Sequence, residues 1–139
     1  MGRINMARVI LGGIVAGIVI DLLAYPLHDI LLKNEHAEAM KALGKTMPEG
    51  GSTLVVWLIY GLVWGIAAVA VYAGFRPRFG PGAMTAIRAA LVAWFFGTAL
   101  TSVAMWNMTL LPISIVEIVG ELIAATLATL AGSAVYREA

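Results

Sequence analysis

The hydrophobic pattern of the chain consists of four long apolar runs separated by short polar segments. The runs cover approximately residues 6–32, 54–75, 83–106 and 113–136. Each is long enough to cross about 30 Å of hydrocarbon as a helix, which takes roughly 20 residues. None alternates polar and apolar positions as a membrane-spanning β-strand does. The pattern therefore predicts an all-α integral membrane protein, a bundle of four transmembrane helices that forms a single domain over residues 1–139.

The polar segments predict how the spans are connected. Residues 34–44 are amphipathic and end in glycine, which indicates a short amphipathic helix in the first loop. Ser52 or Thr53 is placed to cap the second span, because hydroxyl oxygens accept hydrogen bonds from the free N–H groups of a first helical turn. Residues 76–82 predict a tight basic hairpin, and residues 106–112 predict an uncharged turn.

Arginine and lysine are distributed unequally between the two sides of the predicted bundle. One side is flanked by Arg3, Arg8, Arg76, Arg78 and Arg137, whereas the other carries only Lys33, Lys41 and Lys45 beside three glutamates. Because basic residues in short loops stay in the cytoplasm, we expect both termini to be cytoplasmic and the first loop to be extracytoplasmic. The layout resembles that of small four-span bacterial membrane proteins, which implies a location in the bacterial inner membrane.

Composition supports this class and excludes several others. Of the 139 residues, 61% are hydrophobic and 12% are charged, whereas soluble domains have about one quarter charged residues. The net charge of +1 and the scattered basic residues give no basis for nucleic-acid binding. The chain has no cysteine, so neither a disulfide framework nor a thiolate metal site is available. The expected partners are the lipid bilayer and either further copies of the chain or a larger membrane complex.

The first span carries small and ionisable residues on one face. Gly13, Gly17, Asp21 and His28 are separated by steps of four, four and seven residues, which keep them on one side of a helix. Glycines on such a face let a neighbouring backbone come close. An ionisable side chain inside a membrane is costly and is a functional hypothesis by default. Pro26 predicts a kink between Asp21 and His28, because proline removes a backbone hydrogen bond.

The fourth span carries a second polar face at a matching depth. Glu117 and Glu121 are one helical turn apart and lie in the half of the span that follows the uncharged turn. Spans one and four run antiparallel, so we expect His28 to meet Glu117 and Asp21 to approach Glu121 if the two spans touch. Three acids and one histidine would then form a proton- or cation-binding site in the outer half of the bundle.

Further residues of the spans could surround this site. Aromatic and hydroxyl side chains predicted to line the pocket are Tyr25, Tyr60, Trp64, Thr98, Thr101 and Ser102. The glycine pairs Gly13/Gly17 and Gly61/Gly65 are interpreted as helix-packing positions. His36 and Asp29 are expected to face water or lipid headgroups.

Three functions fit these residues. The first is a transporter or channel-type protein in which Asp21, Glu117 and Glu121 bind protons or a cation, with His28 at the outer mouth. Three carboxylates cannot all ionise in a low-dielectric cavity, so a bound cation would displace protons, which is a physical basis for exchange. The second is a non-enzymatic accessory subunit of a larger membrane complex. The third is a metal- or haem-binding protein, whose metal ligands would come from the same four side chains.

Sequence signatures of catalysis are missing. The chain has no phosphate-binding glycine loop, no G-x-S-x-G turn, no H-E-x-x-H motif and no cysteine nucleophile. This favours a non-enzymatic role, and the sequence assigns no catalytic residue and no cofactor.

Overall fold

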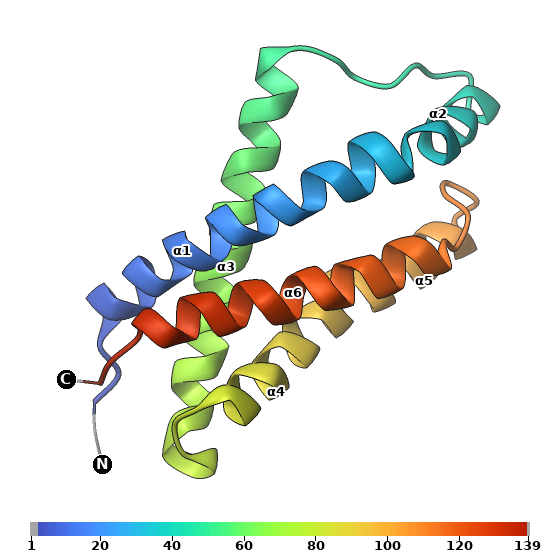
Figure 1. Cartoon of the computed structure of the whole chain (residues 1–139). Coiled ribbons are helices and arrows are strands. Elements are labelled where there is room, and N and C mark those ends of the chain that lie inside the picture. Colours follow the sequence, from blue (N-terminus) through green and yellow to red (C-terminus); the bar gives the residue numbers. More distant parts are fainter. Residues whose placement is uncertain (1–2, 139) are drawn as a thin grey trace.

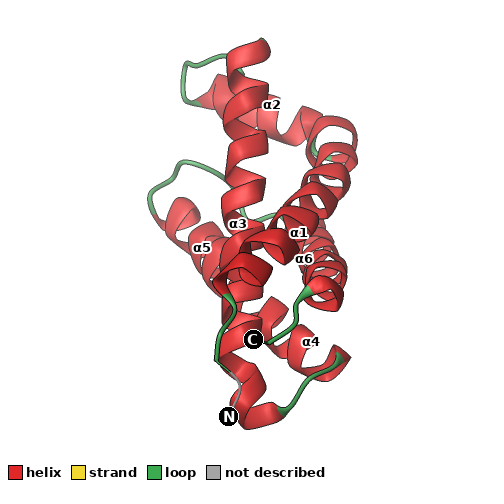
Figure 2. Cartoon of the chain, turned by 90° about the vertical axis from the view of Figure 1, so that its left-hand side faces the viewer, coloured by secondary structure: helices red, strands yellow, loops and turns green. Residues whose placement is uncertain are grey.

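The fold is known from a computed structural model that describes residues 3–138, and every regular element in that range is helical (Figure 2). The first span is α1 (Met6–Pro26) followed by the π-helical turn η1 (Leu27–Leu31). A short helix, α2 (Lys33–Ala42), precedes the second span, α3 (Gly51–Phe79). The third span comprises α4 (Ala83–Trp94), the π-helical turn η2 (Phe95–Ala99) and α5 (Leu100–Asn107), and the fourth is α6 (Ile115–Val135). The prediction of four helices long and apolar enough to cross a membrane is confirmed over the described residues.

Helix α1 has the most extensive contacts in the bundle. It packs most extensively against α3 and then against α6, while α4 packs against both α6 and α3. In Figure 1, α1, α6 and the α4–α5 span run alongside one another, and α3 crosses them steeply. The first turns of α3 are exposed, including Trp57 and Tyr60, and so are Phe96 and Trp106 of the third span. The tightly packed part of the bundle is therefore the half that contains the end of α3 and the start of α4.

Glycines bring the backbones of α1 and its two neighbours into direct contact. A side chain at Gly65 of α3 would overlap the carbonyl of Gly13 and the amide of Gly17 in α1. On an adjoining face of α1, a Cβ atom at Gly12 would lie 2.6 Å from the carbonyl oxygen of Gly132 in α6. Such close approach needs residues without side chains on both helices. The Gly12–Gly132 contact was not anticipated from the sequence.

Two turns of the bundle widen from the α-helical to the π-helical pattern. The first, η1, follows Pro26, which lacks the N–H that an α-helix would bond to the carbonyl four residues earlier. The amide of Leu32 instead donates to the carbonyl of Leu27 at 2.9 Å, five residues back. At η2 the carbonyl of Phe96 accepts a hydrogen bond at 3.1 Å from the hydroxyl of Thr101, in the first turn of α5. Turns of this kind are frequently found at functional sites.

The second span extends further at both ends than predicted. It begins at Gly51 after Gly50, so neither Ser52 nor Thr53 caps it and that prediction is wrong. It also continues through Pro77 to Phe79, where the amide of Gly80 donates to the carbonyl of Arg76 at 2.8 Å. Because Pro77 lies close to the end of the helix, its missing N–H interrupts only one late hydrogen bond. The predicted basic hairpin is consequently reduced to residues 80–82, with positive φ at Gly80 and Gly82.

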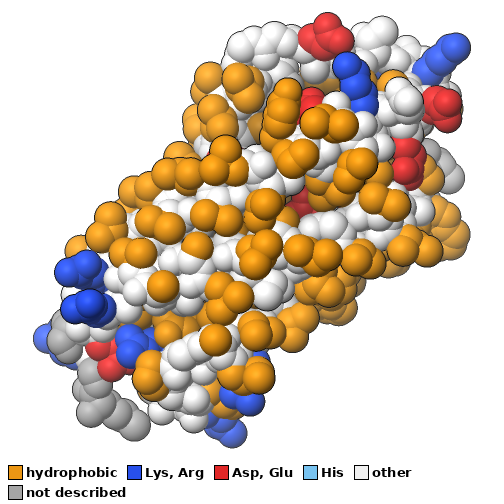
Figure 3. Space-filling view, viewed as in Figure 1, with side chains coloured by type: hydrophobic (Ala, Val, Ile, Leu, Met, Phe, Trp, Pro, Cys, Tyr) orange, Lys and Arg blue, Asp and Glu red, His pale blue; other side chains and the backbone are white. Residues whose placement is uncertain are grey.

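Charged residues collect at the two ends of the molecule, with a hydrophobic surface between them (Figure 3). We call the end with Arg8, Arg76, Arg78 and Arg137 the arginine end, and the end with Lys33, Lys41 and Lys45 the lysine end. At the arginine end the guanidinium of Arg76 lies over the rings of Tyr72 and Tyr136, at 5.9 and 5.2 Å from their centroids. The Tyr136 hydroxyl accepts a hydrogen bond from the amide of Asn5 at 3.4 Å, which joins the first and last spans.

Candidate cation-binding site

A hydrogen bond between the first and last spans forms the centre of the site. His28 Nε2 lies 2.7 Å from Glu121 Oε1, with 32% and 16% of the two side chains exposed. Gly120 makes this contact possible, because a Cβ atom there would lie 2.7 Å from Cδ1 of Leu27. The glycine thus lets η1 pack directly on α6 at the residue before Glu121. The predicted contact between spans one and four is present at this depth.

The hydrogen bond of His28 is one helical turn deeper than the sequence predicted. His28 was expected to meet Glu117, and it does lie near that carboxylate, with ligand atoms within 4.8 Å of each other, but its hydrogen bond is to Glu121, the deeper of the two acids. The π-helical turn after Pro26 accounts for the deeper hydrogen bond, because the side chains of residues 27–31 project in other directions than they would from a regular α-helix.

Asp21 does not join His28 and Glu121 but faces α3. The three atoms closest to a Cβ placed on Gly61 all belong to the carboxyl group of Asp21. The glycine therefore provides the space that the partly buried Asp21 side chain occupies. Seven residues separate Asp21 from His28, which corresponds to about 10 Å along a helix. Asp21 is thus a separate polar point nearer the middle of the bundle.

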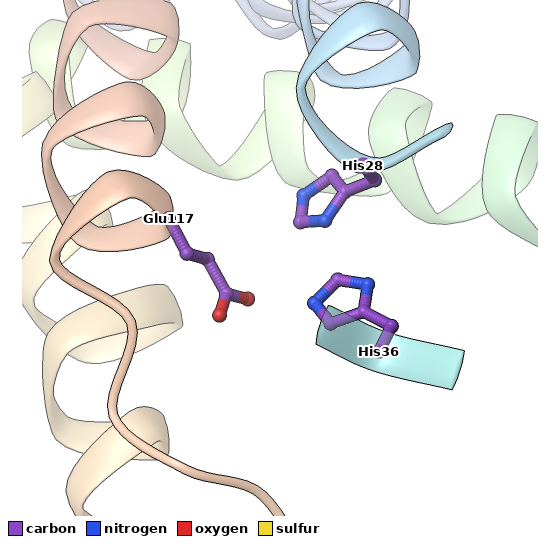
Figure 4. Close-up of side chains that lie close together, drawn as sticks. All are labelled: His28, His36 and Glu117. Atoms are coloured by element: carbon purple, nitrogen blue, oxygen red, sulfur yellow. The ribbon is translucent and has the colours of Figure 1, made fainter. Parts of the chain in front are cut away.

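His36 belongs to the site, although the sequence placed it in water or among headgroups. Its ring stacks on that of His28 with 5.5 Å between centroids and 20° between planes. Figure 4 shows both rings facing the carboxylate of Glu117. One ligand atom from each of the three side chains lies within 4.8 Å of the other two, and all three residues are half-buried. The sequence interpretation did not include His36 in the site, because the pattern alone did not show that α2 lies against the beginning of α6.

Hydrogen bonds connect α2 to the beginning of α6. The hydroxyl of Ser114 donates to Oε2 of Glu35 at 3.3 Å and accepts from the amide of Glu117 at 3.4 Å. Ser114 is the N-cap of α6 and is buried. Glu35, which precedes His36 in α2, is therefore bonded to Ser114, the cap of α6. This contact holds His36 and Glu117 on the two sides of the cluster close together.

The residues predicted to line a pocket are dispersed. Tyr25, Tyr60 and Thr101 are exposed, whereas Thr98 and Ser102 are half-buried in η2 and α5. Trp64 packs against the small core formed by Ile20, Ala124 and Ala128. The aromatic residue that hydrogen-bonds to α6 near the site is Trp94, whose indole Nε1–H donates to the carbonyl of Ile118 at 2.9 Å. The sequence interpretation did not single out Trp94.

Two open, apolar depressions lie on this part of the molecule and contain none of the polar groups of the site. One of about 200 Å³ lies between α1, η1 and α6, and is lined by Leu23, Pro26, Leu27, Leu31, Gly120, Ile123 and Ala124. The other, of about 370 Å³, lies between α2 and the turn that follows α5. Neither is lined by Asp21, His28, Glu117 or Glu121. Outside these two spaces, His28, His36, Glu117 and Glu121 meet as a compact cluster at the lysine end, and Asp21 lies apart from it.

Comparison of the chain with known protein families, with curated proteins and with solved structures found no match. The function has to be inferred from the site itself.

Proposed function

We propose that the protein is a small membrane transport protein, of carrier or channel type, that binds a proton or another cation at the cluster around His28 and Glu121. The observation that carries the proposal is the 2.7 Å contact between these side chains, which joins the first and last spans. Ionisable groups in such segments are expensive and are retained where they handle ions or protons.

Charge explains why a cation is the expected ligand. Glu117 and Glu121 lie one helical turn apart on α6, and Glu35 approaches from α2. A single hydrogen-bonded pair would suffice to hold two helices together, whereas this arrangement adds further carboxylates around it. Carboxylates gathered in a poorly solvated place favour a positively charged ligand, because their mutual repulsion falls when it binds.

Asp21 provides a second polar position along the same helix. It lies about 10 Å closer to the arginine end than His28, as judged by the rise of a helix, and it is partly buried against Gly61. A cation that leaves the cluster towards the cytoplasm would meet Asp21 next. The proposed direction assigns the lysine end to the extracytoplasmic side, as the arginine distribution predicts.

The test is ion flux into liposomes that contain the purified protein. A trapped pH dye reports protons, and trapped indicators report monovalent and divalent cations. We expect flux of at least one cation above that of empty liposomes, and Glu121→Gln should reduce it at least about 10-fold, because it removes the charge at the site.

The matched control is Glu38→Gln, which removes the same charge from an exposed position on α2. This variant should retain the flux of the unmodified protein. The proposal is refuted if no cation crosses faster than in empty liposomes, or if Glu121→Gln and Glu38→Gln behave alike.

A second candidate function is that of an accessory subunit in a larger membrane complex. It is favoured by the exposed aromatic residues on the first half of α3 and on the third span, such as Trp57 and Phe96. In this case the cluster would serve as a polar contact between helices. Mild extraction from native membranes separates the candidates, because a stoichiometric partner that co-purifies supports the accessory role and a lone homo-oligomer contradicts it.

A further inference from the structure

The cluster at the lysine end contains more nitrogen ligands than a proton or alkali-metal site needs. His28 comes from η1, His36 from α2 and Glu117 from the first turn of α6, so three separate segments supply one side chain each. Both histidines of the chain are in this one place. In Figure 4 the two rings and the carboxylate enclose a common space.

The ligand types select among cations. Imidazole nitrogen suits zinc, copper, nickel and iron, whereas magnesium and calcium prefer oxygen ligands. Two imidazoles and one carboxylate are a typical set for a zinc ion that keeps its fourth position open. Ligand atoms bound to one such ion at about 2.0–2.2 Å lie roughly 3.3–3.6 Å apart. The three ligand atoms, which lie within 4.8 Å of one another, would close by about 1 Å through side-chain rotation.

Glu121 prepares His28 for this role. Its carboxylate contacts Nε2, so the proton of a neutral ring is held on Nε2 and the lone pair is left on Nδ1. Histidines that bind metals commonly donate their other ring N–H to a carboxylate, which fixes the tautomer and the orientation of the ring. The hydrogen bonds from Ser114 to Glu35 and from Glu117 to Ser114 hold α2 and α6 at the same place.

We infer that His28, His36 and Glu117 bind a divalent first-row transition-metal ion such as Zn²⁺, with Glu121 orienting His28. This inference deepens the proposed function and rests on it for any physiological role, because it names the class of cation that the transport site accepts. Binding itself is a separate property that can be measured without transport. The open fourth position would let the ion arrive and leave by exchange of ligands.

The test is metal binding by the full chain in detergent, after treatment with a chelator. Zn²⁺ affinity is measured by competition with a fluorescent zinc indicator, and Co²⁺ serves as a spectroscopic probe of tetrahedral coordination. We expect one Zn²⁺ per chain, no displacement by millimolar Mg²⁺, and a Co²⁺ absorption spectrum typical of four-coordinate nitrogen and oxygen ligands. His36→Gln should weaken Zn²⁺ binding more than about 100-fold, because even groups that only orient a ligand contribute about 10- to 100-fold.

Two further variants separate ligation from folding. His36→Cys replaces one zinc ligand by another, so it should recover most of the affinity that His36→Gln loses and shift the Co²⁺ spectrum through its thiolate. Glu38→Gln, an exposed carboxylate on the same helix, should bind Zn²⁺ like the unmodified chain. Circular dichroism of the variants checks that their helical content is equal.

The outcomes distinguish the two proposals. Zn²⁺ affinity that is unchanged in His36→Gln, or equal competition by Mg²⁺, overturns the metal site even if cation flux persists. Stoichiometric Zn²⁺ binding together with an absence of any cation flux supports the metal site and overturns the transport function.

Discussion

The contact between Asp21 and Gly61 can be tested by a double-mutant cycle. A Cβ atom on Gly61 would overlap both the Oδ1 and the Cγ atoms of Asp21. Because Cγ itself is among the overlapping atoms, rotation of the terminal carboxyl group alone does not relieve the clash. Gly61→Ala should therefore overpack this part of the α1–α3 contact, and Asp21→Ala should remove the atoms responsible.

The expected coupling free energy between Gly61→Ala and Asp21→Ala follows from two opposing effects of the added methyl group. Overpacking of a well-packed position costs about 1–3 kcal/mol, whereas alanine in place of glycine inside a helix gains up to about 1 kcal/mol. In the Asp21→Ala background only the second effect remains. The effect of Gly61→Ala on the free energy of unfolding should thus differ between the two backgrounds by about 2 kcal/mol.

The assay is reversible unfolding of the four variants in mixed micelles, followed by circular dichroism. Asp21→Asn provides a size control, because it keeps the volume of the side chain and should keep the clash with Gly61→Ala. Gly74→Ala is the matched helix control, since no atom lies within 4 Å of its added Cβ. A coupling below about 0.5 kcal/mol, the usual limit for independent sites, refutes the contact between Asp21 and Gly61.

Two further substitutions test contacts that the sequence did not indicate. Trp94→Phe removes the 2.9 Å hydrogen bond to the carbonyl of Ile118 and should lower the free energy of unfolding by about 1 kcal/mol, whereas Trp106→Phe at an exposed position should change it by less than about 0.5 kcal/mol. Arg76→Gln removes a guanidinium that lies over two tyrosine rings with 15% of its side chain exposed, and should cost about 2 kcal/mol. The exposed Arg8 is its control, because Arg8→Gln should be close to neutral. Equal effects within either pair would contradict the corresponding contact.

The spans and the acids of α6 could be predicted because they depend on local pattern alone. An apolar run of some 20 residues has few stable alternatives to a membrane helix, and the four-residue spacing of Glu117 and Glu121 places both on one face. His28 could be assigned to the same depth by counting from the ends of the spans. These steps need no knowledge of which helices are neighbours.

The partners of these side chains could not be predicted, because they depend on how the helices pack. The widened turn after Pro26 directs His28 to Glu121, and a regular period of 3.6 residues does not describe it. Asp21 turns to α3 because Gly61 leaves room there. His36 follows His28 by eight residues, which is a usable signal only when α2 is known to continue closely from η1.

The glycine contacts of α1 have a mechanical consequence. In its first half the helix touches backbone of two neighbouring helices, through Gly12 against α6 and through Gly13 and Gly17 against α3. If α1 slid or rotated there, its main-chain atoms would collide with those of α3 and α6, so this half of α1 is held in place. Beyond Pro26 the turn η1 packs on α6 and α2, and proline marks a natural pivot. A ligand that pulls on His28 would therefore displace the segment beyond Pro26 more readily than the part of α1 that is packed through its glycines.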